Sequence, residues 1–253
     1  MIVPGGLWRQ IEVRAETGST NADVAEAVRR GESEGLVVVA ERQMSGRGRR
    51  DRQWMSPARA GLTLSVLLRP GPAVSPKTWG WVPLLAGVAL RTAVCRRAGV
   101  DAALKWPNDL LIGDAKCAGI LAEVVDDAVV LGIGLNVTTR ADELPTTSGP
   151  ATSLRLAGAR DTDRDPLLRS ILRAVAQWYG GWREAGGDAE MCGLLSAYRS
   201  ACATLGRTVT VRLPGGTDLV GTATTVDRDG QLLIRTPDGR EHCVTAGDVL
   251  HVR

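Results

Sequence analysis

Histidine is scarce in this 253-residue chain, and its cysteines form no recognisable pairs. The two histidines, His242 and His251, lie close to the C-terminus, so the main body cannot assemble a His-rich metal site or a Ser-His-Asp triad. Five cysteines are scattered without a Cys-x-x-Cys spacing, which argues against a disulfide framework and a zinc knuckle. We therefore expect reduced thiols and no metal site made by the protein alone.

Long apolar runs and a strong net charge are also absent. No run approaches the roughly 18 apolar residues that a membrane-spanning helix needs, and the first residues do not have the pattern of a secretory signal. The expected location is therefore the cytoplasm, without membrane contact. With 31 basic and 28 acidic residues the net charge is +3, which is too small to indicate nucleic-acid binding by itself.

The alternation of apolar runs and turn residues predicts an α+β protein with two domains. Residues 1–205 carry long helices and strands, whereas residues 206–253 carry short alternating runs broken by glycine turns, typical of a small barrel. Helices are expected at 21–30, 78–98, 165 to a stop at Gly180–Gly181, and 189–203. Strands are expected at 36–40, 62–68, 102–106, 109–112, 118–125, 128–137, 209–213, 219–226, 232–236 and 241–244.

The segment Gly46 to Trp54 is the richest in chemistry, with four arginines and two glycines in a loop between two predicted strands. Glycines leave backbone amides open to an anion, and arginine forks bind phosphate oxygens in bidentate fashion. A polyanionic ligand is the functional interpretation. The alternative is a solvated loop in an arginine-rich protein. The segment matches neither a Walker nor a Rossmann nucleotide motif.

Three further patterns accompany this loop. Lys105 to Asp109, Lys-Trp-Pro-Asn-Asp, combines a cation, a ring, an amide and a carboxylate that suit ligand orientation or magnesium binding, although Pro-Asn-Asp is also a common turn. Lys116, one of only three lysines, enters an apolar strand, where a phosphate is one candidate partner and surface exposure the alternative. Alternating glycines in Gly132 to Val137 allow close approach by a ligand or by a packed helix.

Taken in order with Ser19-Thr20-Asn21 and with Lys116 to Glu123, these motifs resemble the biotin protein ligases over nearly the whole chain. The resemblance implies a mixed β-sheet catalytic domain flanked by helices, followed by a small SH3-like β-barrel. It also implies ATP-dependent formation of biotinyl-5'-AMP and transfer of biotin to a lysine of a carboxylase's biotin carboxyl carrier domain. Magnesium would accompany ATP. Since the first motif begins at Ser19, we expect the short form without a DNA-binding domain, acting as a monomer or weak dimer.

The resemblance assigns roles by position. The expected catalytic residues are Lys116 and Arg49, with Asp109 a hypothetical orienter of the acceptor lysine. The expected biotin contacts are Ser19, Thr20, Asn21, Gln43, Gly46, Arg47, Gly48, Arg49, Lys116 and Gly119. The expected ATP and adenylate contacts are Arg47, Arg49, Arg52, Trp54, Lys105, Asn108, Asp109, Lys116 and Asn136.

One position departs from the family pattern, because Asp51 stands where a glycine is usual. Its negative charge beside bound phosphates is expected to alter loop closure or nucleotide affinity. Two other functions remain open. A lipoate ligase or octanoyltransferase has a similar fold, and a nucleic-acid-binding module would use the same arginines, although no aromatic-basic stacking pattern accompanies them.

Overall fold

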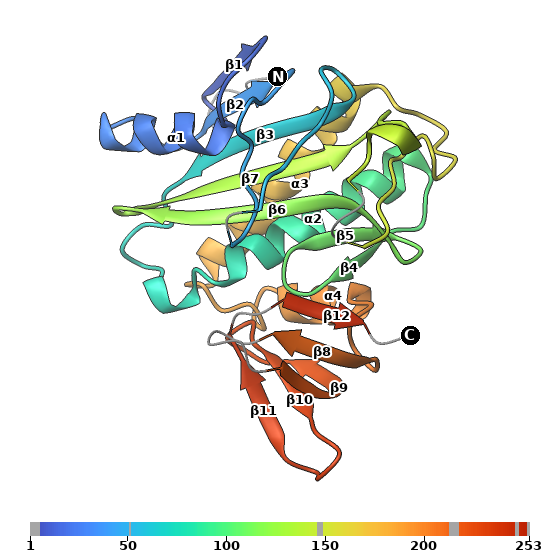
Figure 1. Cartoon of the computed structure of the whole chain (residues 1–253). Coiled ribbons are helices and arrows are strands. Elements are labelled where there is room, and N and C mark those ends of the chain that lie inside the picture. Colours follow the sequence, from blue (N-terminus) through green and yellow to red (C-terminus); the bar gives the residue numbers. More distant parts are fainter. Residues whose placement is uncertain (1–5, 51, 146–148, 213–217, 246–247, 252–253) are drawn as a thin grey trace.

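Two β-sheets organise the chain in the computed structural model, which describes residues 6–50, 52–145, 149–212, 218–245 and 248–251. Asp51, and Leu213 at the end of one expected strand, lie outside these residues. Figure 1 shows the larger sheet with its helices and the smaller sheet below it. The predicted fold class, a mixed sheet flanked by helices followed by a small β-structure, is confirmed.

The larger sheet has the order β1-β2-β3-β7-β6-β5-β4. β1 and β2 are parallel and the remaining neighbours are antiparallel, so the sheet is mixed. Its strands are β1 (Gln10–Arg14), β2 (Leu36–Ala40), β3 (Gly61–Leu68), β4 (Ala103–Lys105), β5 (Asp109–Ile112), β6 (Ala115–Val125) and β7 (Ala128–Asn136).

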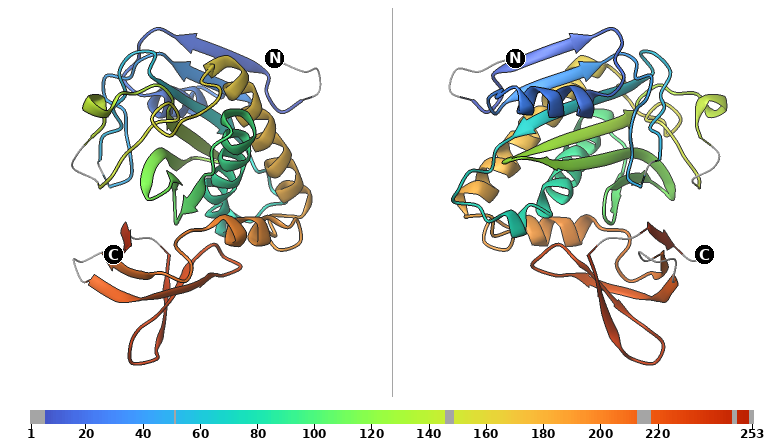
Figure 2. Two further views of the ribbon diagram at one scale, coloured as in Figure 1. Left: turned by 90° about the vertical axis from the view of Figure 1, so that its right-hand side faces the viewer. Right: turned by 60° about the vertical axis from the view of Figure 1, so that its left-hand side comes forward.

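Helices cover both faces of this sheet (Figure 2). Alternate residues of a strand point to opposite faces, so Val37 and Val39 of β2 join the main core, while Leu36 and Val38 join a separate cluster with α1. The helices are α1 (Thr20–Arg29), α2 (Trp81–Ala98), α3 (Arg164–Glu184) and α4 (Leu194–Ala201), with short 3₁₀ turns η1 (Pro76–Thr78) and η2 (Ala141–Glu143).

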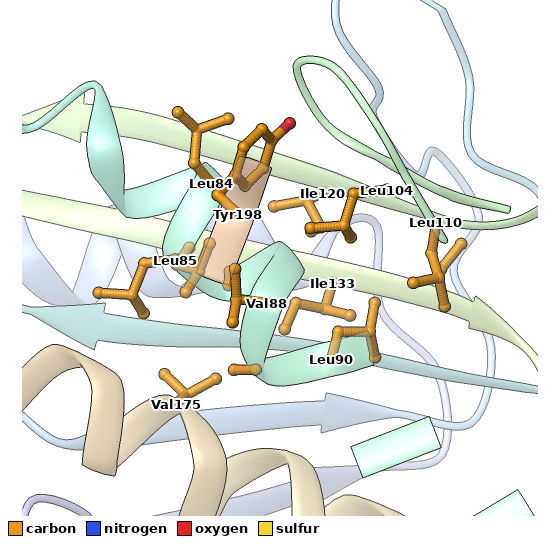
Figure 3. Packing of buried hydrophobic residues seen from close by; sticks show 14 of the residues in the cluster. Leu84, Leu85, Val88, Leu90, Leu104, Leu110, Ile120, Ile133, Val175 and Tyr198 are labelled. Atoms are coloured by element: carbon orange, nitrogen blue, oxygen red, sulfur yellow. The ribbon is translucent and has the colours of Figure 1, made fainter. Parts of the chain in front are cut away.

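The main core lies between the sheet and the helices α2, α3 and α4. Figure 3 shows leucines of α2 packed against Leu104 and Ile120 of the sheet and against Tyr198 of α4. α2 is buried around most of its circumference, with Leu85, Ala86 and Leu90 fully buried, so it runs through the core. This core holds the strands β4 to β7 in place.

Four helix boundaries differ from the prediction by two residues or more. α2 begins at Trp81 and not at 78, and α4 ends at Ala201 and not at 203. α3 continues through Gly180–Gly181 to Glu184, because Trp182 beyond the glycines is fully buried, and its burial outweighs a cost of about 1 kcal/mol per glycine. α4 begins at Leu194 and not at 189, because Gly193 has a φ of 77°, in the left-handed region, which interrupts the helix.

Strand predictions were wrong in three places. β1 and β12 were not expected, since each is short and becomes a strand only by pairing with β2 or β8. β6 starts at Ala115 and not at 118, which places Lys116 inside the strand. Its backbone N–H donates to the carbonyl of Pro150 at 2.9 Å, and its carbonyl accepts from Thr152 at 2.9 Å.

The smaller sheet has the order β11-β10-β9-β8-β12. Among the described residues β11 and β12 are its edges and do not pair, so the sheet is curved and consistent with the predicted SH3-like barrel but is not closed. Its strands are β8 (Thr208–Arg212), β9 (Asp218–Val226), β10 (Leu232–Arg235), β11 (Glu241–Val244) and β12 (Asp248–His251).

The side chain of His251 links the stability of the protein to pH. The His251 ring of β12 lies with Nε2 3.1 Å from Thr204 Oγ1 and Nδ1 3.4 Å from an Arg207 nitrogen. Partial burial, together with the positive charges of Lys105 and Arg207, lowers its pKa from 6.5 to about 4, while Asp114 opposes this shift. The folded protein therefore holds a neutral imidazole.

We expect His251 to make the folded state less stable as pH falls from 6.5 towards about 4, because the unfolded chain takes up a proton that the folded ring resists. Thermal unfolding of the wild type and of His251→Gln, compared above and below this window, measures the effect. The variant should lose less stability on acidification. A difference between the two proteins that does not change with pH would contradict the assignment.

Candidate active site

A polar network joins the start of α1 to the middle of the larger sheet. Ser19 caps the helix, its Oγ accepting from the N–H of Ala22 at 3.5 Å. Thr20 donates from both its N–H and its hydroxyl to Gln43 Oε1, at 2.8 and 3.0 Å. Ser65 Oγ on β3 lies 2.7 Å from Thr20 Oγ1 and 2.6 Å from Asn21 Oδ1. These side chains are held in fixed orientations at one face of the sheet.

The network continues from α1 to the arginine-rich loop. Asn21 Nδ2 donates to one oxygen of Glu123 at 2.7 Å, and an Arg47 nitrogen donates to the other at 3.2 Å. Sequence reasoning gave no role to Ser65 or Glu123. Both are polar residues in otherwise apolar strands, and that pattern was the available signal, since such a side chain needs a partner.

Three glycines form a side-chain-free floor on β6 and β7. A Cβ atom on Gly132 would lie 2.1 Å from Asn21 Oδ1, and one on Gly134 would lie 2.3 Å from an atom of the Trp54 ring. A Cβ on Gly119 would contact both Trp54 and Lys116, at 3.3 and 3.4 Å. Glycine is therefore needed at these positions because the side chains of Asn21, Trp54 and Lys116 lie close to the strand backbone.

The loop from Gly46 to Trp54 closes on itself. The Trp54 N–H donates to the Gly46 carbonyl at 2.9 Å, and the Gly48 N–H donates to the Arg52 carbonyl at 2.6 Å. A Cβ on Gly46 would lie 2.2 Å from the Trp54 carbonyl oxygen, so only glycine allows this closure without a shift of the backbone. Trp54 is thereby brought down onto the glycine floor.

The loop's arginines reach different parts of the molecule. Arg47 pairs with Glu123, an Arg49 nitrogen donates to Asn108 Oδ1 at 3.2 Å, and an Arg50 nitrogen donates to the carbonyl of Arg212 in β8 at 3.3 Å. Together with Leu121 and Glu123, the loop lines a cavity of about 550 Å³. Concentrated guanidinium charge around a cavity is suited to binding an anion.

Lys116 lies beside the glycine floor, next to Gly119. Its Nζ lies 2.6 Å from Asp109 Oδ1 in an ion pair and 6.0 Å from the Trp54 ring centroid. Trp54 Nε1 is buried without a hydrogen-bond partner among the described residues, which leaves a donor for a ligand. Lys116 and the Trp54 ring thus both lie against Gly119.

Asn108 and Asp109 are positioned by the tight hairpin between β4 and β5. Asn108 Nδ2 donates to the Ile120 carbonyl at 2.9 Å, while its Oδ1 accepts from Arg49. Lys105 on β4 lies opposite Asp109 on β5 in the register of the two antiparallel strands. The hairpin therefore presents one residue to Arg49 and the next to Lys116.

Two of the expected residues have partners outside the polar network and the arginine-rich loop. Asn136, at the end of β7, is buried and donates from Nδ2 to the Thr152 carbonyl at 3.0 Å. Lys105 contributes to the electrostatic environment of His251. The structure brings the other expected residues that it describes together around the glycine floor and the loop.

Neither cysteine chemistry nor a protein-held metal ion suits this site. Burial raises the pKa of Cys117, the neighbour of Lys116, to about 12, so its thiol stays protonated and unreactive near neutral pH. Among the described residues no three His, Cys, Asp or Glu side chains cluster as metal ligands. The arrangement is suited to charge compensation of a ligand.

A second cavity, of about 280 Å³, lies beside α3 and is not the candidate site. Its acidic group, Glu34, is already held by the Tyr179 hydroxyl at 2.7 Å and by Arg183 at 2.9 Å. This carboxylate links α3 to the segment before β2. Its role is therefore structural.

Comparison with known proteins identifies the family. Residues 17–138 match the biotin/lipoate A/B protein ligase family, and residues 204–252 match the biotin protein ligase C-terminal domain. A biotin–[acetyl-CoA-carboxylase] ligase of Mycobacterium tuberculosis is 42% identical, over 100% of this chain and 93% of that protein. The chain belongs to the biotin protein ligase family.

Two further relatives support this membership. The bifunctional ligase/repressor BirA of Bacillus spizizenii is 32% identical to this biotin protein ligase over 87% of this chain and 68% of BirA. The solved biotin protein ligase of Aquifex aeolicus, in complex with biotin and ATP, is 28% identical with a TM-score of 0.81. That match covers 97% of this chain and 100% of the other, so it includes both sheets.

No described helix of the chain is both long and apolar enough to cross a membrane.

We expect Glu123→Gln to loosen the loop, because the neutral amide no longer attracts Arg47. The ion pair is exposed and contributes less than about 1 kcal/mol, so cleavage of the loop by trypsin should rise no more than about fivefold. Glu16→Gln is the matched control, since Glu16 pairs with Arg42, at 3.2 Å, outside the network. Equal cleavage of the two variants between residues 47 and 52, mapped by mass spectrometry, would contradict the role of Glu123.

Proposed function

We propose that this chain activates biotin with ATP to biotinyl-5'-AMP and transfers biotin to the ε-amine of a lysine on a biotin carboxyl carrier domain. The observation that carries the proposal is Lys116 beside the glycine floor, next to the Trp54 ring that the arginine-rich loop brings onto it. A relative of the same fold at 28% identity was solved with biotin and ATP. The M. tuberculosis relative is named for acetyl-CoA carboxylase, which supports a carboxylase as the acceptor.

In the first step a carboxylate oxygen of biotin attacks the α-phosphorus of ATP. The bond from that phosphorus to the bridging oxygen breaks, and pyrophosphate leaves with the electron pair. Negative charge grows on the α-phosphoryl oxygens, where a fixed donor contributes about 3 kcal/mol of transition-state stabilisation. Lys116 and Arg49 are our catalytic residues, and both are already positioned by the hairpin residues Asp109 and Asn108.

In the second step the acceptor amine attacks the carbonyl carbon of the mixed anhydride. The bond from this carbon to the phosphate oxygen breaks, AMP leaves, and the nitrogen loses a proton. Neither step needs a protein nucleophile, in agreement with the protonated thiol of Cys117. Asp109 is the proposed orienter of the incoming amine, because its carboxylate lies beside Lys116. The loop excludes water from the anhydride, which hydrolyses readily.

Biotin and the nucleotide are proposed to occupy different parts of the site. Biotin would lie over the glycine floor next to α1, and the nucleotide would lie towards the arginines and Trp54. The proposed biotin contacts are Ser19, Thr20, Asn21, Gln43, Gly46, Arg47, Gly48, Arg49, Lys116 and Gly119. The proposed nucleotide contacts are Arg47, Arg49, Arg52, Trp54, Lys105, Asn108, Asp109, Lys116 and Asn136.

Magnesium would arrive bound to the phosphates of ATP, since no cluster of protein ligands is available for it among the described residues. We further propose that the catalytic part is residues 1–205 and that residues 206–253 form a second domain. The expected setting is the cytoplasm, and the expected assembly a monomer or weak dimer.

A lipoate or octanoate ligase of the same fold is the alternative, because one matching family model includes both biotin and lipoate enzymes. The match of residues 204–252 to the biotin ligase C-terminal domain favours biotin. Incubation with labelled ATP and either biotin or lipoate, followed by chromatography of the adenylate, tests the two against each other. Formation of lipoyl-AMP without biotinyl-AMP would overturn the proposal.

Lys116→Ala should lower the rate of biotinyl-AMP formation at least about 100-fold, because the transition state loses a charged donor. Lys77→Ala, in the exposed turn η1, is the control and should keep full activity. Lys116→Arg retains the positive charge and can still pair with Asp109, so it should recover part of the rate that Lys116→Ala loses. Near-normal single-turnover adenylation by a folded Lys116→Ala protein would contradict the assignment.

A further inference from the structure

The turn between β9 and β10, residues 227–231, inserts into the catalytic part of the chain. Two indole N–H groups donate to its backbone: Trp81 Nε1 to the Arg228 carbonyl at 2.7 Å, and Trp106 Nε1 to the Gly230 carbonyl at 3.0 Å. Gly230 has a φ of 79°, and a Cβ there would lie 2.8 Å from Leu84 Cδ1. Only glycine fits both this backbone conformation and the space beside Leu84.

Hydrogen bonds within the turn hold its shape. The carboxylate of Asp227 accepts from the N–H of Asp229 at 2.9 Å and from that of Gln231 at 2.8 Å. A carboxylate that holds two backbone donors fixes the turn in one conformation. The smaller sheet, seen below the larger one in Figures 1 and 2, therefore contacts the catalytic part through a turn that is braced by its own hydrogen bonds.

The two tryptophans lie in different elements and contact different residues. Trp81 begins α2 and continues into the core, where its ring packs edge-on against Tyr198. Trp106 lies in the hairpin between β4 and β5, two residues before Asn108 and three before Asp109. Its ring is buried, and its backbone N–H donates to Thr204 Oγ1 at 3.1 Å, so its backbone is held within the catalytic part while its side chain is held by the turn.

We propose that Trp106 is a positioning residue through which the docked turn sets the geometry of the catalytic cations. The Gly230 carbonyl accepts a hydrogen bond from the Trp106 indole and so fixes the hairpin that carries this side chain. The hairpin in turn places Asn108 against Arg49 and Asp109 against Lys116. This inference rests on the proposed function and extends it. The smaller sheet becomes part of the adenylation machinery without touching the ligand.

The test compares Trp106→Phe with Trp81→Phe in the full chain. Each substitution keeps a buried aromatic ring, removes one N–H, and leaves one carbonyl of the same turn without its partner. Both variants should show a similar loss of thermal stability. Single-turnover formation of biotinyl-AMP should fall tenfold or more in Trp106→Phe, in the rate at saturating ATP and biotin, and stay within twofold of wild type in Trp81→Phe.

A second measurement separates positioning from general loosening. If Trp106 acts through the cations, Trp106→Phe should lower the rate of Lys116→Ala by clearly less than it lowers the wild-type rate, because one of the two interactions that it positions is already gone. Equal activity losses in the two tryptophan variants would overturn the proposal. So would full additivity with Lys116→Ala.

Asp227→Ala provides an independent approach should Trp106→Phe not fold. It loosens the turn from the C-terminal side and leaves both tryptophans intact, so adenylation should again slow in a folded protein. Unchanged adenylation in this variant would contradict the proposal. A wild-type protein that makes no biotinyl-AMP would instead contradict the proposed function, so the two failures are distinguishable.

Discussion

The site depends on the close approach that Gly132 and Gly134 allow on β7. A side chain at either position would collide with a group lying on the strand, the Asn21 amide at the first and the Trp54 ring at the second. Without this bare surface, α1 could not place its polar first turn against β3, and the loop could not bring Trp54 onto the sheet. The position of β7 is stabilised by hydrophobic burial, because β2, β3 and β7 bury apolar side chains on both faces of the sheet.

The arginine-rich loop illustrates how repulsion among like charges is managed. Its guanidinium groups are dispersed to separate acceptors: a carboxylate on β6, an amide in the β4–β5 hairpin and a backbone carbonyl on β8. Each acceptor is provided by a different element, so the loop bridges both sheets. These contacts are mostly exposed and therefore individually weak, which keeps the arginines available to an anion that binds more strongly.

The C-terminal sheet contributes buried contacts as well as surface ones. Indole donors on Trp81 and Trp106, and the neutral ring of His251 beside Thr204, all lie where the smaller sheet contacts the rest of the chain. Their hydrogen bonds satisfy polar groups that burial would otherwise leave unpaired. A small open sheet thereby becomes continuous with the core around α2 and α4, and its position is tied to the hairpin that carries Asn108 and Asp109.

The amino-acid sequence alone determined the types of residue at the site and most of the regular elements. Periodicity was sufficient for β2, β3, β5, β7 and α1, because apolar spacing and caps act over a few residues. It failed for β1 and β12, which exist only through pairing, and for the end of α3, where burial of Trp182 overrides two glycines.

The motifs also identified Lys116, the loop and the glycines, but not their connections. Asn21 meets Glu123 across 102 positions, Arg49 meets Asn108 across 59, and Trp106 meets Gly230 across 124. Such contacts depend on strand register and on how the layers pack, and neither is encoded in any local stretch of sequence. For that reason only the tertiary structure decided that Ser65 and Glu123 join the site, and that a turn of the C-terminal sheet supports it.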